Sequence, residues 1–488
     1  MLHVPICNCH SRYAQVCSPE LLLSTCALRA GKFDLDKTFA VVAVMEMQDI
    51  TAVLPSGKQQ TVTLAVSAKV QELKEILQRC FDQQFLVLLD SRGVVLRVDD
   101  MITSAASSHC VTCVARLPRL ASTWQAFALW CHNDDRVVTW GHPAYGSDSS
   151  GVCKRLRKVV QIVASVRSFA AVTSNGSVVT WGFPKVLVDT SMVRQQLYDV
   201  RSVTAAAQGA FAALRHDGSV VTWGDPSCGG DSSAAQAKLK GVTQIQSTDA
   251  AFAAILLDGS VVTWGDPSVG GDSSMVQDRL QGIVSLQGNH YAFAAVTEEG
   301  SLVTWGKATL GGDSSTVQGN LRQKVRQAAP SSKGFFAILE DRSLIYWGQH
   351  ASGIGMSAVK HQLTSVRQVC STMDSFAALR QDGSVVTWGS EASGGNSCSV
   401  QAQLQDVQEI FATSGAFAAL RTDDTVVTWG LPGFGGSINS SDVLMDVKFI
   451  HGSAAAFAAV RHNGSIVTWG AKDKGGDSSA VQSAFATF

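Results

Sequence analysis

The dipeptide Trp-Gly recurs nine times at nearly constant spacing, and this periodicity constrains the fold more than any other feature of the chain. The tryptophans stand 40–42 residues apart, at positions 140, 181, 223, 264, 305, 347, 388, 429 and 469. A phenylalanine precedes eight of them by twelve residues and the first by thirteen. Such repeats are copies of one supersecondary unit that buries its apolar face against its neighbours. Residues 122–488 are therefore expected to form an array of nine units.

Each unit reads as a set of short antiparallel strands. In the fourth unit, "FAAILL" and "SVVTWG" flank Asp258-Gly259, a dipeptide typical of a two-residue hairpin turn with φ > 0 at both central positions. The segment "VQEIFAT" (407–413) and its counterparts supply a further strand. Units of about 41 residues with three or four short strands are typical of propeller blades. The predicted fold class is mainly β, a β-propeller of nine repeat units.

The apolar pattern of the unit predicts how neighbouring sheets pack. The strand "FAAL" is apolar at every position, so both of its faces must be covered, and its small alanines allow a close approach of the next sheet. The tryptophans keep a fixed place in a strand and are expected in the core. Asp135, Arg342 and Asp424 replace the turn glycine in three units, where we expect looser hairpins.

The segment "GGDSSMVQDRL" (270–280) has the composition of a ligand site, but architecture explains it better. Val276 and Leu280 fall on one face of a short helix, Asp272 stands in N-cap position, and Gly270-Gly271 permits a sharp turn. One aspartate per unit is too few for calcium, no histidine keeps a fixed place beside the serines, and no lysine follows the glycines as in a phosphate loop. We expect no catalytic residue, metal or cofactor in the repeats.

With these motifs in order, the unit "FAAL-x-x-DGSVVTWG-x-x-x-x-GG" resembles the repeat of the regulator of chromosome condensation family and of beta-lactamase inhibitor protein II. The resemblance covers residues 122–488 and implies a propeller. It departs from the family where Gly-Gly-Asp-Ser replaces the usual Gly-Gln-Leu-Gly, and nine units stand where members typically have seven, so the number of blades stays open.

A second resemblance concerns residues 47–118, which follow an N-terminal extension (1–46). "ITAVLPSGKQQTVTLAV" reads as a hairpin, "SAKVQELKEILQRCF" as an amphipathic helix, and "QQFLVLLDSRG" and "CVTCVARL" as two further strands. This order resembles a ubiquitin-like α+β (β-grasp) domain. The resemblance implies that Val87 and Val114 belong to a hydrophobic recognition patch.

Charge and cysteine content narrow the functional classes. The net charge is −1, with 12 basic and 11 acidic residues in 1–119 and 27 and 29 in the rest, so nucleic acid is not an expected partner. No apolar run is long enough to cross a membrane.

A zinc site near the N-terminus stays an alternative, formed by Cys7, Cys9, Cys17 and Cys26 with His10. The spacing of these residues fits no common zinc-ligand pattern, so free thiols are the better interpretation. Reduced thiols favour a cytoplasmic protein, with the nucleus as the alternative.

Cys110 and Cys113 have CxxC spacing within a predicted strand. We expect them to pack in a core rather than to bind a metal.

One position varies among units whose frame is otherwise nearly fixed. It lies five residues after each tryptophan and carries Tyr145, Val186, Cys228, Val269, Leu310, Ser352, Ser393, Phe434 and Lys474. Ring symmetry would place all nine on one face, where exposed aromatic and apolar groups would form a binding surface.

The function favoured by the sequence is a non-enzymatic scaffold whose propeller binds a protein partner, with a link to the ubiquitin pathway through the small domain. Two alternatives follow from the resemblance. One is a relative of the HECT-type ubiquitin ligases that lacks their catalytic domain, and the other is a guanine-nucleotide exchange factor for a small GTPase.

Overall fold

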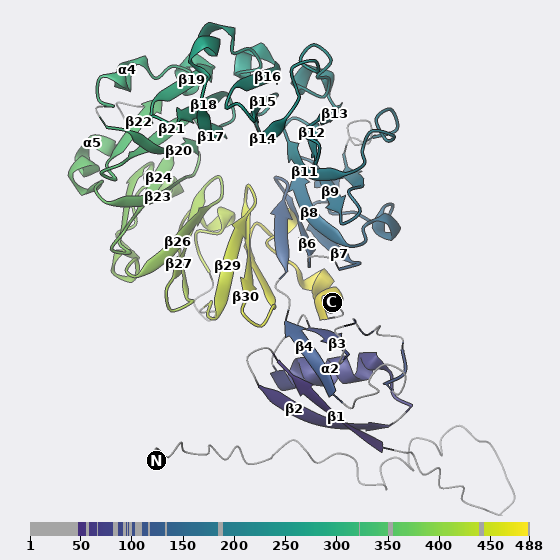
Figure 1. Ribbon diagram of the computed structural model, residues 1–488. Coiled ribbons are helices and arrows are strands. Elements are labelled where there is room, and N and C mark those ends of the chain that lie inside the picture. Colours follow the sequence, from purple (N-terminus) through teal and green to yellow (C-terminus); the bar gives the residue numbers. More distant parts are fainter. Residues whose placement is uncertain are drawn as a thin grey trace, which may run out of the picture.

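The computed structural model describes residues 47–486 except 55–57, 66, 82–85, 91–93, 95, 97–99, 103–109, 116–117, 132–133, 184–188, 322, 350–354 and 439–443. A large ring of sheets surrounds a central opening, and a smaller α+β domain precedes it in the chain (Figure 1). The ring contains nine three-stranded antiparallel sheets, and the small domain one four-stranded sheet. The sequence prediction of a mainly β propeller is confirmed.

The nine sheets, here called blades 1 to 9, follow one another along the chain. Blades 1 to 4 are β5 (Arg119–Ser122), β6 (Ala126–Trp130), β7 (Val137–Gly141); β8 (Val159–Ala164), β9 (Ser168–Thr173), β10 (Val178–Gly182); β11 (Val200–Ala205), β12 (Ala210–Arg215), β13 (Val220–Gly224); and β14 (Val242–Ser247), β15 (Ala251–Leu256), β16 (Val261–Gly265). Blades 5 to 9 are β17 (Ile283–Gly288), β18 (Ala292–Thr297), β19 (Leu302–Gly306); β20 (Val325–Ser331), β21 (Gly334–Leu339), β22 (Leu344–Gly348); β23 (Val366–Ser371), β24 (Ser375–Arg380), β25 (Val385–Gly389); β26 (Val407–Ala412), β27 (Ala416–Arg421), β28 (Val426–Gly430); and β29 (Val447–Gly452), β30 (Ala456–Arg461), β31 (Ile466–Gly470).

Each blade runs outward from the opening, with its first strand innermost and its third strand outermost (Figure 1). The loops that join first and second strands, here called the mouth loops, lie at one end of the ring. The hairpins that join second and third strands lie at the other end, because a loop and a hairpin cap opposite ends of the same second strand. The ring therefore has a mouth face and a hairpin face.

Aromatic pairs hold adjacent blades together. Phe252 stands directly opposite Trp264 in the register of β15 and β16, and their rings stack with centroids 5.2 Å apart. This pair shares a core cluster with Ala212 of the preceding blade. All nine tryptophans are buried, as the sequence predicts. The two alanines of "FAAL" face opposite neighbours: Ala170 lies where the aromatic pair of the next blade packs, and Ala171 lies on the side of the preceding blade.

A hydrogen bond between blades accompanies this packing. The indole Nε1 of Trp264 donates to the carbonyl of Gly229 in blade 3 at 3.1 Å. Gly229 has φ +92, and a Cβ atom there would lie 2.7 Å from the ring of Phe252. The first glycine of "GG" is therefore required by both backbone conformation and space. The same bond joins Trp140 to Gly475, Trp181 to Gly146, Trp305 to Gly270, Trp347 to Gly311, Trp429 to Gly394 and Trp469 to Gly435.

The hairpin turns differ from the sequence prediction. Gly259 alone has φ > 0, at +75, and its N–H donates to the carbonyl of Leu256. The turn is thus a three-residue type with one left-handed residue, and Asp258 contributes its carboxylate, which accepts from the Ser260 amide at 2.9 Å. Arg342 and Asp424 adopt the same left-handed conformation, with φ 63 and 62, and keep the turn hydrogen bond. Replacement of glycine therefore strains these two turns and does not open them.

The segment that contains "GGDSS", and its counterparts in the other units, is here called the outer segment. It covers the outer edge of its blade and takes the place of a fourth strand. Ser273 lies 3.0 Å from Thr263 of β16 (oxygen to oxygen), and Gln277 donates to the carbonyl of Val261. The short helix is a 3-10 helix, η7 (Ser274–Arg279), and its N-cap residue is Ser273 rather than Asp272. The Asp272 carboxylate accepts the Ser274 amide at 2.9 Å, so the expected role of the aspartate in holding the helix start is confirmed.

Short helices of the ring fall in two sets. The first follows the Trp-Gly dipeptide and comprises η2 (Pro143–Tyr145), η5 (Pro226–Cys228), η6 (Pro267–Val269), η8 (Ala308–Leu310), η10 (Glu391–Ser393), η12 (Pro432–Phe434) and η13 (Lys472–Lys474). The second belongs to the outer segments and comprises η3 (Cys153–Arg155), η7, α4 (Ser315–Gln318), α5 (Met356–Val359), η9 (Lys360–Gln362), η11 (Gln401–Gln403), η14 (Ser479–Val481) and α6 (Gln482–Ala486).

Blade 9 closes the ring against blade 1, which settles the number of blades at nine. The Ala454 amide donates to the Trp124 carbonyl at 3.2 Å. Phe485 of α6 is fully buried and meets the ring of Trp140 edge-on at 5.5 Å. The last unit, which ends in "VQSAFATF", therefore packs directly against the first.

The small domain has a mixed sheet of order β2-β1-β4-β3. Its elements are β1 (Met47–Val53), β2 (Gln59–Ala65), α2 (Val70–Phe81), β3 (Leu86–Leu89) and β4 (Cys110–Ala115). Strand β4 pairs in parallel with β1, and α2 buries Val70, Leu73, Leu77 and Phe81. The α+β element order expected for 47–118 is present, while the specific resemblance to ubiquitin stays a prediction. The extension 1–46, with Cys7, Cys9, His10, Cys17 and Cys26, lies outside the described residues.

Candidate functional site

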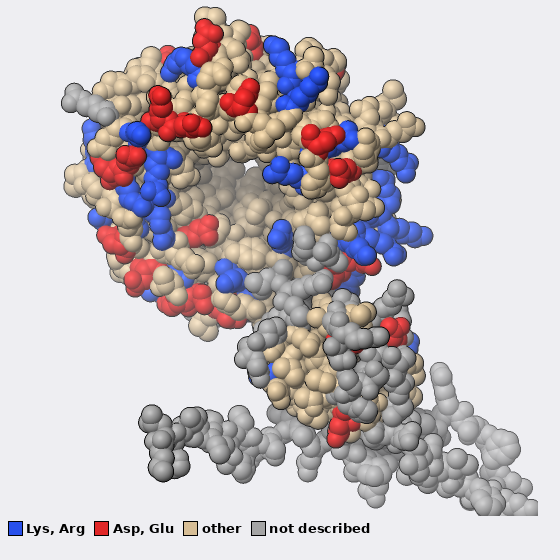
Figure 2. All heavy atoms as spheres, viewed as in Figure 1, with Lys and Arg blue, Asp and Glu red and all other residues tan. Residues whose placement is uncertain are grey.

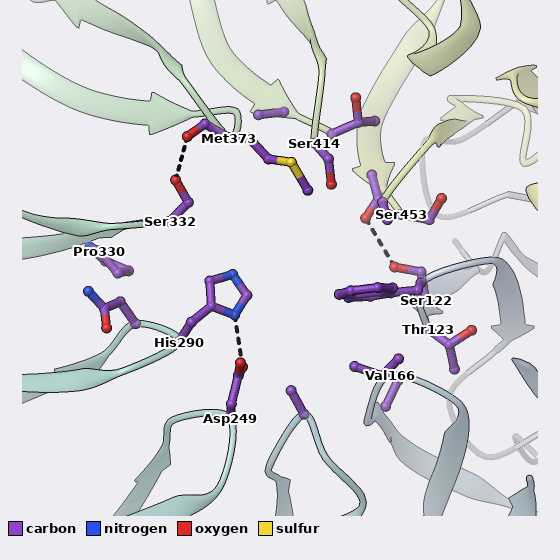
Figure 3. A pocket seen from close by; sticks show the side chains of 18 of the residues that line it. Ser122, Thr123, Val166, Asp249, His290, Pro330, Ser332, Met373, Ser414 and Ser453 are labelled. Atoms are coloured by element: carbon purple, nitrogen blue, oxygen red, sulfur yellow. Dashed lines mark hydrogen bonds and ion pairs between the residues drawn. The ribbon is translucent and has the colours of Figure 1, made fainter. Parts of the chain in front are cut away.

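The mouth loops surround a cavity of 540 Å³ at the centre of the mouth face (Figure 3). All nine blades contribute residues to its lining. In most blades the mouth loop begins with a small polar residue. In blade 4 this residue is Thr248, whose hydroxyl oxygen accepts a hydrogen bond from the amide of Ala251, three residues further on. Thr123, Asn289, Thr372, Thr413 and Ser453 accept the equivalent amide in their own loops. This side-chain bond gives the loops a common backbone shape.

Backbone hydrogen bonds link the apices of adjacent mouth loops. The Asp249 amide, for example, donates to the carbonyl of His290 in the next blade at 3.1 Å. Equivalent bonds run from Trp124 to Val166, Val166 to Ala207, Gln208 to Asp249, Met373 to Ser414, Ser414 to Ala454 and Ala454 to Trp124. At these seven seams the rim of the mouth is held by main-chain contacts that do not involve the apical side chains.

The apical side chains differ strongly although their backbones match. The apices carry Trp124, Val166, Ala207, Asp249, His290, Ser332, Met373, Ser414 and Ala454. Trp124 is 47% exposed and Met373 53% exposed, and both line the cavity. A fixed frame with variable and partly apolar side chains is typical of a recognition surface.

Asp249 and His290 form the charged element of the mouth. His290 Nδ1 lies 2.8 Å from Asp249 Oδ1, and Figure 3 shows the two side chains facing each other across adjacent loops. This hydrogen bond to the carboxylate raises the pKa of His290, against the opposing effect of burial. The Ser332 hydroxyl donates to the carbonyls of Thr372 and Met373, so its proton is directed away from the histidine. The pair adds polar groups to the mouth, and the Ser332 hydroxyl is not aligned with the histidine as a nucleophile would be.

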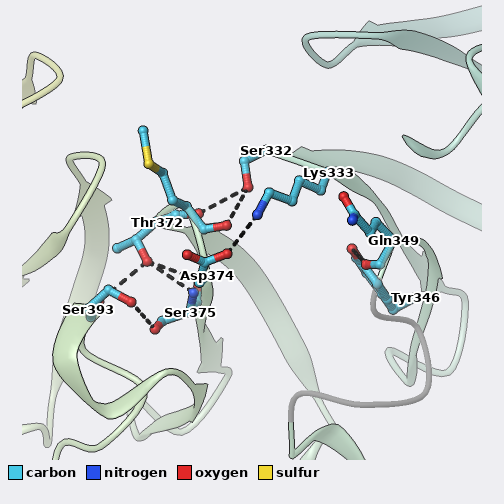
Figure 4. A network of polar contacts seen from close by, with 9 residues as sticks. Ser332, Lys333, Tyr346, Gln349, Thr372, Asp374, Ser375 and Ser393 are labelled. Carbon is cyan, nitrogen blue, oxygen red and sulfur yellow. Dashed lines mark hydrogen bonds and ion pairs between the residues drawn. The ribbon is translucent and has the colours of Figure 1, made fainter. Parts of the chain in front are cut away.

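Blade 6 departs from the regular rim (Figure 4). Pro330 stands in β20 and has no N–H to donate. The apex of this loop bonds to blade 7 through the Ser332 side chain, as above, and Lys333 Nζ pairs with Asp374 at 2.8 Å. Side-chain contacts therefore replace the main-chain link at this seam.

The positions five after each tryptophan lie at the ends of the first set of short helices, but the expected exposure is wrong for four of them. Cys228, Val269, Leu310 and Ser393 are buried. They turn inward because the following glycine is left-handed and brings the helix end against the next blade. Tyr145, Phe434 and Lys474 are partly exposed, while Val186 and Ser352 lie outside the described residues.

Tyr145 and Phe434 adjoin the mouth loops of their blades. The Thr123 hydroxyl donates to the Tyr145 carbonyl at 2.8 Å, and Thr413 does the same for Phe434. These two residues are thus brought toward the mouth. Binding of a partner through the nine positions that follow the tryptophans stays a prediction. The apices of the mouth loops were not predicted from the sequence. In most units they stand three residues before the repeated phenylalanine, and their variation within an otherwise fixed repeat could have identified them.

The remaining sequence predictions concern the small domain, metals and membranes. Val87 is partly buried and Val114 is its cross-strand partner. Cys113 packs in the core of the small domain as expected, and burial raises its pKa to about 12, whereas Cys110 is exposed. Within the described ranges, no three His, Cys, Asp or Glu side chains come together as metal ligands. The helices of that same part of the chain are all too short or too polar to span a bilayer.

The fold and the mouth define a nine-bladed β-propeller with three-stranded blades and a cavity at the centre of one face. No protein-family model matches the sequence, and no curated protein matches it. Among solved structures, the chain is similar to Prp20p from Saccharomyces cerevisiae, studied for its binding to Gsp1p and histones (13% identity, 67% of this chain and 86% of Prp20p, TM-score 0.35). It is also similar to yeast RCC1 (Prp20) bound to Kap60 (15%, 73% and 79%, 0.35) and to human WBSCR16 (14%, 57% and 78%, 0.34). At these identities and scores, the likenesses carry no argument about function.

Proposed function

We propose that the chain is a non-enzymatic scaffold that binds a protein partner through the mouth face of its ring. The observation that carries the proposal is the rim itself, in which a backbone that is hydrogen-bonded at seven seams presents nine side chains of seven types around a concave surface. Exposed Trp124 and Met373 are of the types that supply most of the energy in interfaces. A rigid rim also lowers the entropy cost of binding.

Two alternatives lead to different chemistry. A HECT-type ligase transfers ubiquitin through a nucleophilic cysteine of its catalytic domain, and a relative that lacks this domain would act as a binding protein. Guanine-nucleotide exchange on a small GTPase would use the same mouth face for a protein partner, so it is the second candidate. Stimulated nucleotide release from a purified GTPase would favour exchange over a passive scaffold.

The small domain is proposed as a second recognition module in a cytoplasmic protein, with the nucleus as the alternative compartment. Its sheet order places β3 beside β4, with Val87 opposite Val114 in the register. If the domain acts like ubiquitin, this pair belongs to its docking patch and links the scaffold to ubiquitin-pathway proteins.

The test of the mouth proposal is a double substitution, Trp124→Ser with Met373→Ser. Both side chains are exposed, so the fold is expected to survive. Partners captured by the wild-type chain are identified by mass spectrometry, purified, and titrated against both chains. We expect the dissociation constant to rise about tenfold or more, because apolar anchors are lost from the interface.

The matched control is Leu257→Ser with Met275→Ser. These residues are 80% and 94% exposed and lie on a hairpin and an outer segment, away from the mouth. An unchanged affinity in the mouth variant, or an equal loss in the control, would show that the mouth is not the binding surface.

A further inference from the structure

A second candidate surface lies on the hairpin face, in the groove between blades 1 and 2. Its volume is 540 Å³, and its walls are the outer segments of blades 1 and 2 and the hairpin of blade 2. Five exposed basic side chains line it: Lys154, Arg155, Arg157, Lys158 and Arg194. No acidic residue is among the residues that line it.

The basic charge is a local feature that the averages over long stretches of sequence conceal. Residues 151–201 contain eight Lys or Arg and two Asp, a net charge of +6 in a chain whose total is −1. Lys and Arg gather at the edge of the ring on the side of the first blades, at the right in Figure 2. A second group of Lys and Arg, at the left in Figure 2, lies beside Asp and Glu side chains. The near balance of basic and acidic residues in 1–119 and in the rest of the chain, from which no nucleic-acid partner is expected, does not hold within this segment.

An equivalent groove between blades 4 and 5 shows that the charge is not required by the architecture. It is lined by Arg279, Glu298, Glu299 and Lys324, which together carry no net charge. Arg279 donates to the Leu302 carbonyl at 3.0 Å and so serves the structure. Its counterpart Arg155 makes no side-chain hydrogen bond or ion pair with any described residue, and neither do the other four basic side chains.

The polar lining also distinguishes this groove. Lys158 occupies the left-handed position before the first strand of blade 2, with φ +52, where other blades carry glycine, serine or aspartate. A lysine at this position adds a positive charge to the lining of the groove. Asn175 accepts from Thr173 and Ser177 through its Oδ1, which leaves its amide N–H groups for a ligand. The lining therefore presents cations together with neutral donors.

We infer that this groove docks a carboxylate-rich segment of a protein partner. The inference rests on the proposed function in that the occupant is a protein, but it concerns the opposite face of the ring. Guanidinium groups bind carboxylates in a bidentate manner, and five cations in one groove match a short acidic segment. A nucleic acid would need a longer basic track and free aromatic platforms, whereas the ring of nearby Tyr198 is covered by Arg215 at 3.9 Å.

The experiment measures fluorescence anisotropy of a labelled Glu-rich peptide titrated with the full chain. The groove variant is Arg155→Glu with Arg157→Glu. The control is Lys238→Glu with Lys240→Glu, which makes the same change in net charge at the equivalent exposed positions of blade 3. We expect the groove variant to lose affinity for the peptide by about tenfold or more and the control to retain it. Circular dichroism melts establish that both variants fold.

Three further arms separate the remaining outcomes. A neutral peptide of equal length should not bind. A single-stranded oligonucleotide and phosphatidylserine vesicles should bind more weakly than the acidic peptide; tighter binding of either, lost in the groove variant, would overturn the assignment to a protein segment. No binding of the peptide by the wild-type chain, or equal losses in the groove variant and control, would overturn the site. The mouth variant Trp124→Ser with Met373→Ser should bind the acidic peptide normally, so failure of one proposal does not imply failure of the other.

Discussion

At the scale of single residues, the side chain of the repeated tryptophan contributes to the stability of the fold in two ways. Its ring fills the space over the alanines of the preceding blade, and its N–H satisfies a buried glycine carbonyl. Removing the N–H while keeping a large ring would leave that carbonyl without its partner, at a cost of about 1–3 kcal/mol. The chain contains an internal comparison, because the Nε1 atom of Trp223 has no hydrogen-bond partner among the described residues.

We predict that Trp264→Phe lowers the free energy of unfolding more than Trp223→Phe does, by about 1 kcal/mol. The two rings are 5% and 4% exposed, so the loss of buried area is nearly the same in both variants. Chemical denaturation with a common slope for all chains measures the difference. Equal destabilisation of the two variants would mean that the indole hydrogen bond contributes nothing to stability.

At the scale of elements, most blades connect to the next through a left-handed residue just before the first strand. This residue is a glycine at Gly241 and Gly282 and another residue at Ser365 and Asp406. The amide that follows it donates to the hairpin of the preceding blade, as Val366 does to the carbonyl of Arg342. The conformation is therefore imposed by the connection between blades, and non-glycine residues there are strained.

We predict that Ser365→Gly stabilises the chain by up to about 1 kcal/mol, because relief of strain exceeds the extra entropy of an unfolded glycine. The reciprocal change, Gly282→Ser, should destabilise it by about 1–2 kcal/mol through strain alone, since only the distal atoms of Glu298 come near a Cβ there. Melting temperatures of both variants test the pair. The same sign of change in both would contradict the explanation.

At the scale of the whole molecule, stability depends on the contact between blades 9 and 1. His451 of β29 lies at this contact, with Nε2 3.1 Å from the Ser122 hydroxyl and its ring edge-on to Phe127. Burial lowers the pKa of His451 to about 4. The closed ring therefore favours the neutral imidazole. The equivalent residues of blades 4 and 5, Gln246 and Gln287, do not titrate.

We predict that acid weakens the closed ring through His451. Its pKa is about 6.5 when unfolded and about 4 when folded, so its contribution is complete above pH 6.5 and is lost as the pH falls toward 4, by up to about 3 kcal/mol. Thermal unfolding between pH 7 and 4.5 measures this loss. The variant His451→Gln should be less sensitive to acid than the wild-type chain. An identical pH profile for the variant would exclude His451 as the titrating group.

Much of the fold could be predicted because the same local sequence pattern recurs nine times. The Phe–Trp spacing, the doubly apolar strand and the aspartate at the start of the outer segment all follow from local sequence, and the structure confirms them. The type of hairpin turn could not be read from Asp-Gly alone, because that dipeptide is compatible with two turn geometries. The burial of Cys228, Val269 and Leu310 was missed because it depends on the next blade.

By itself, the sequence determined the blade unit, the number of units and the burial of their aromatic pairs, since these depend on residues close together in the chain. Tertiary structure alone decided that all nine units close in one ring, because closure brings Trp140 against Phe485 from opposite ends of the propeller. It also decided where the surfaces lie. The mouth gathers two or three residues from each blade, and the basic groove joins residues 154–158 to Arg194, so neither exists until neighbouring blades pack.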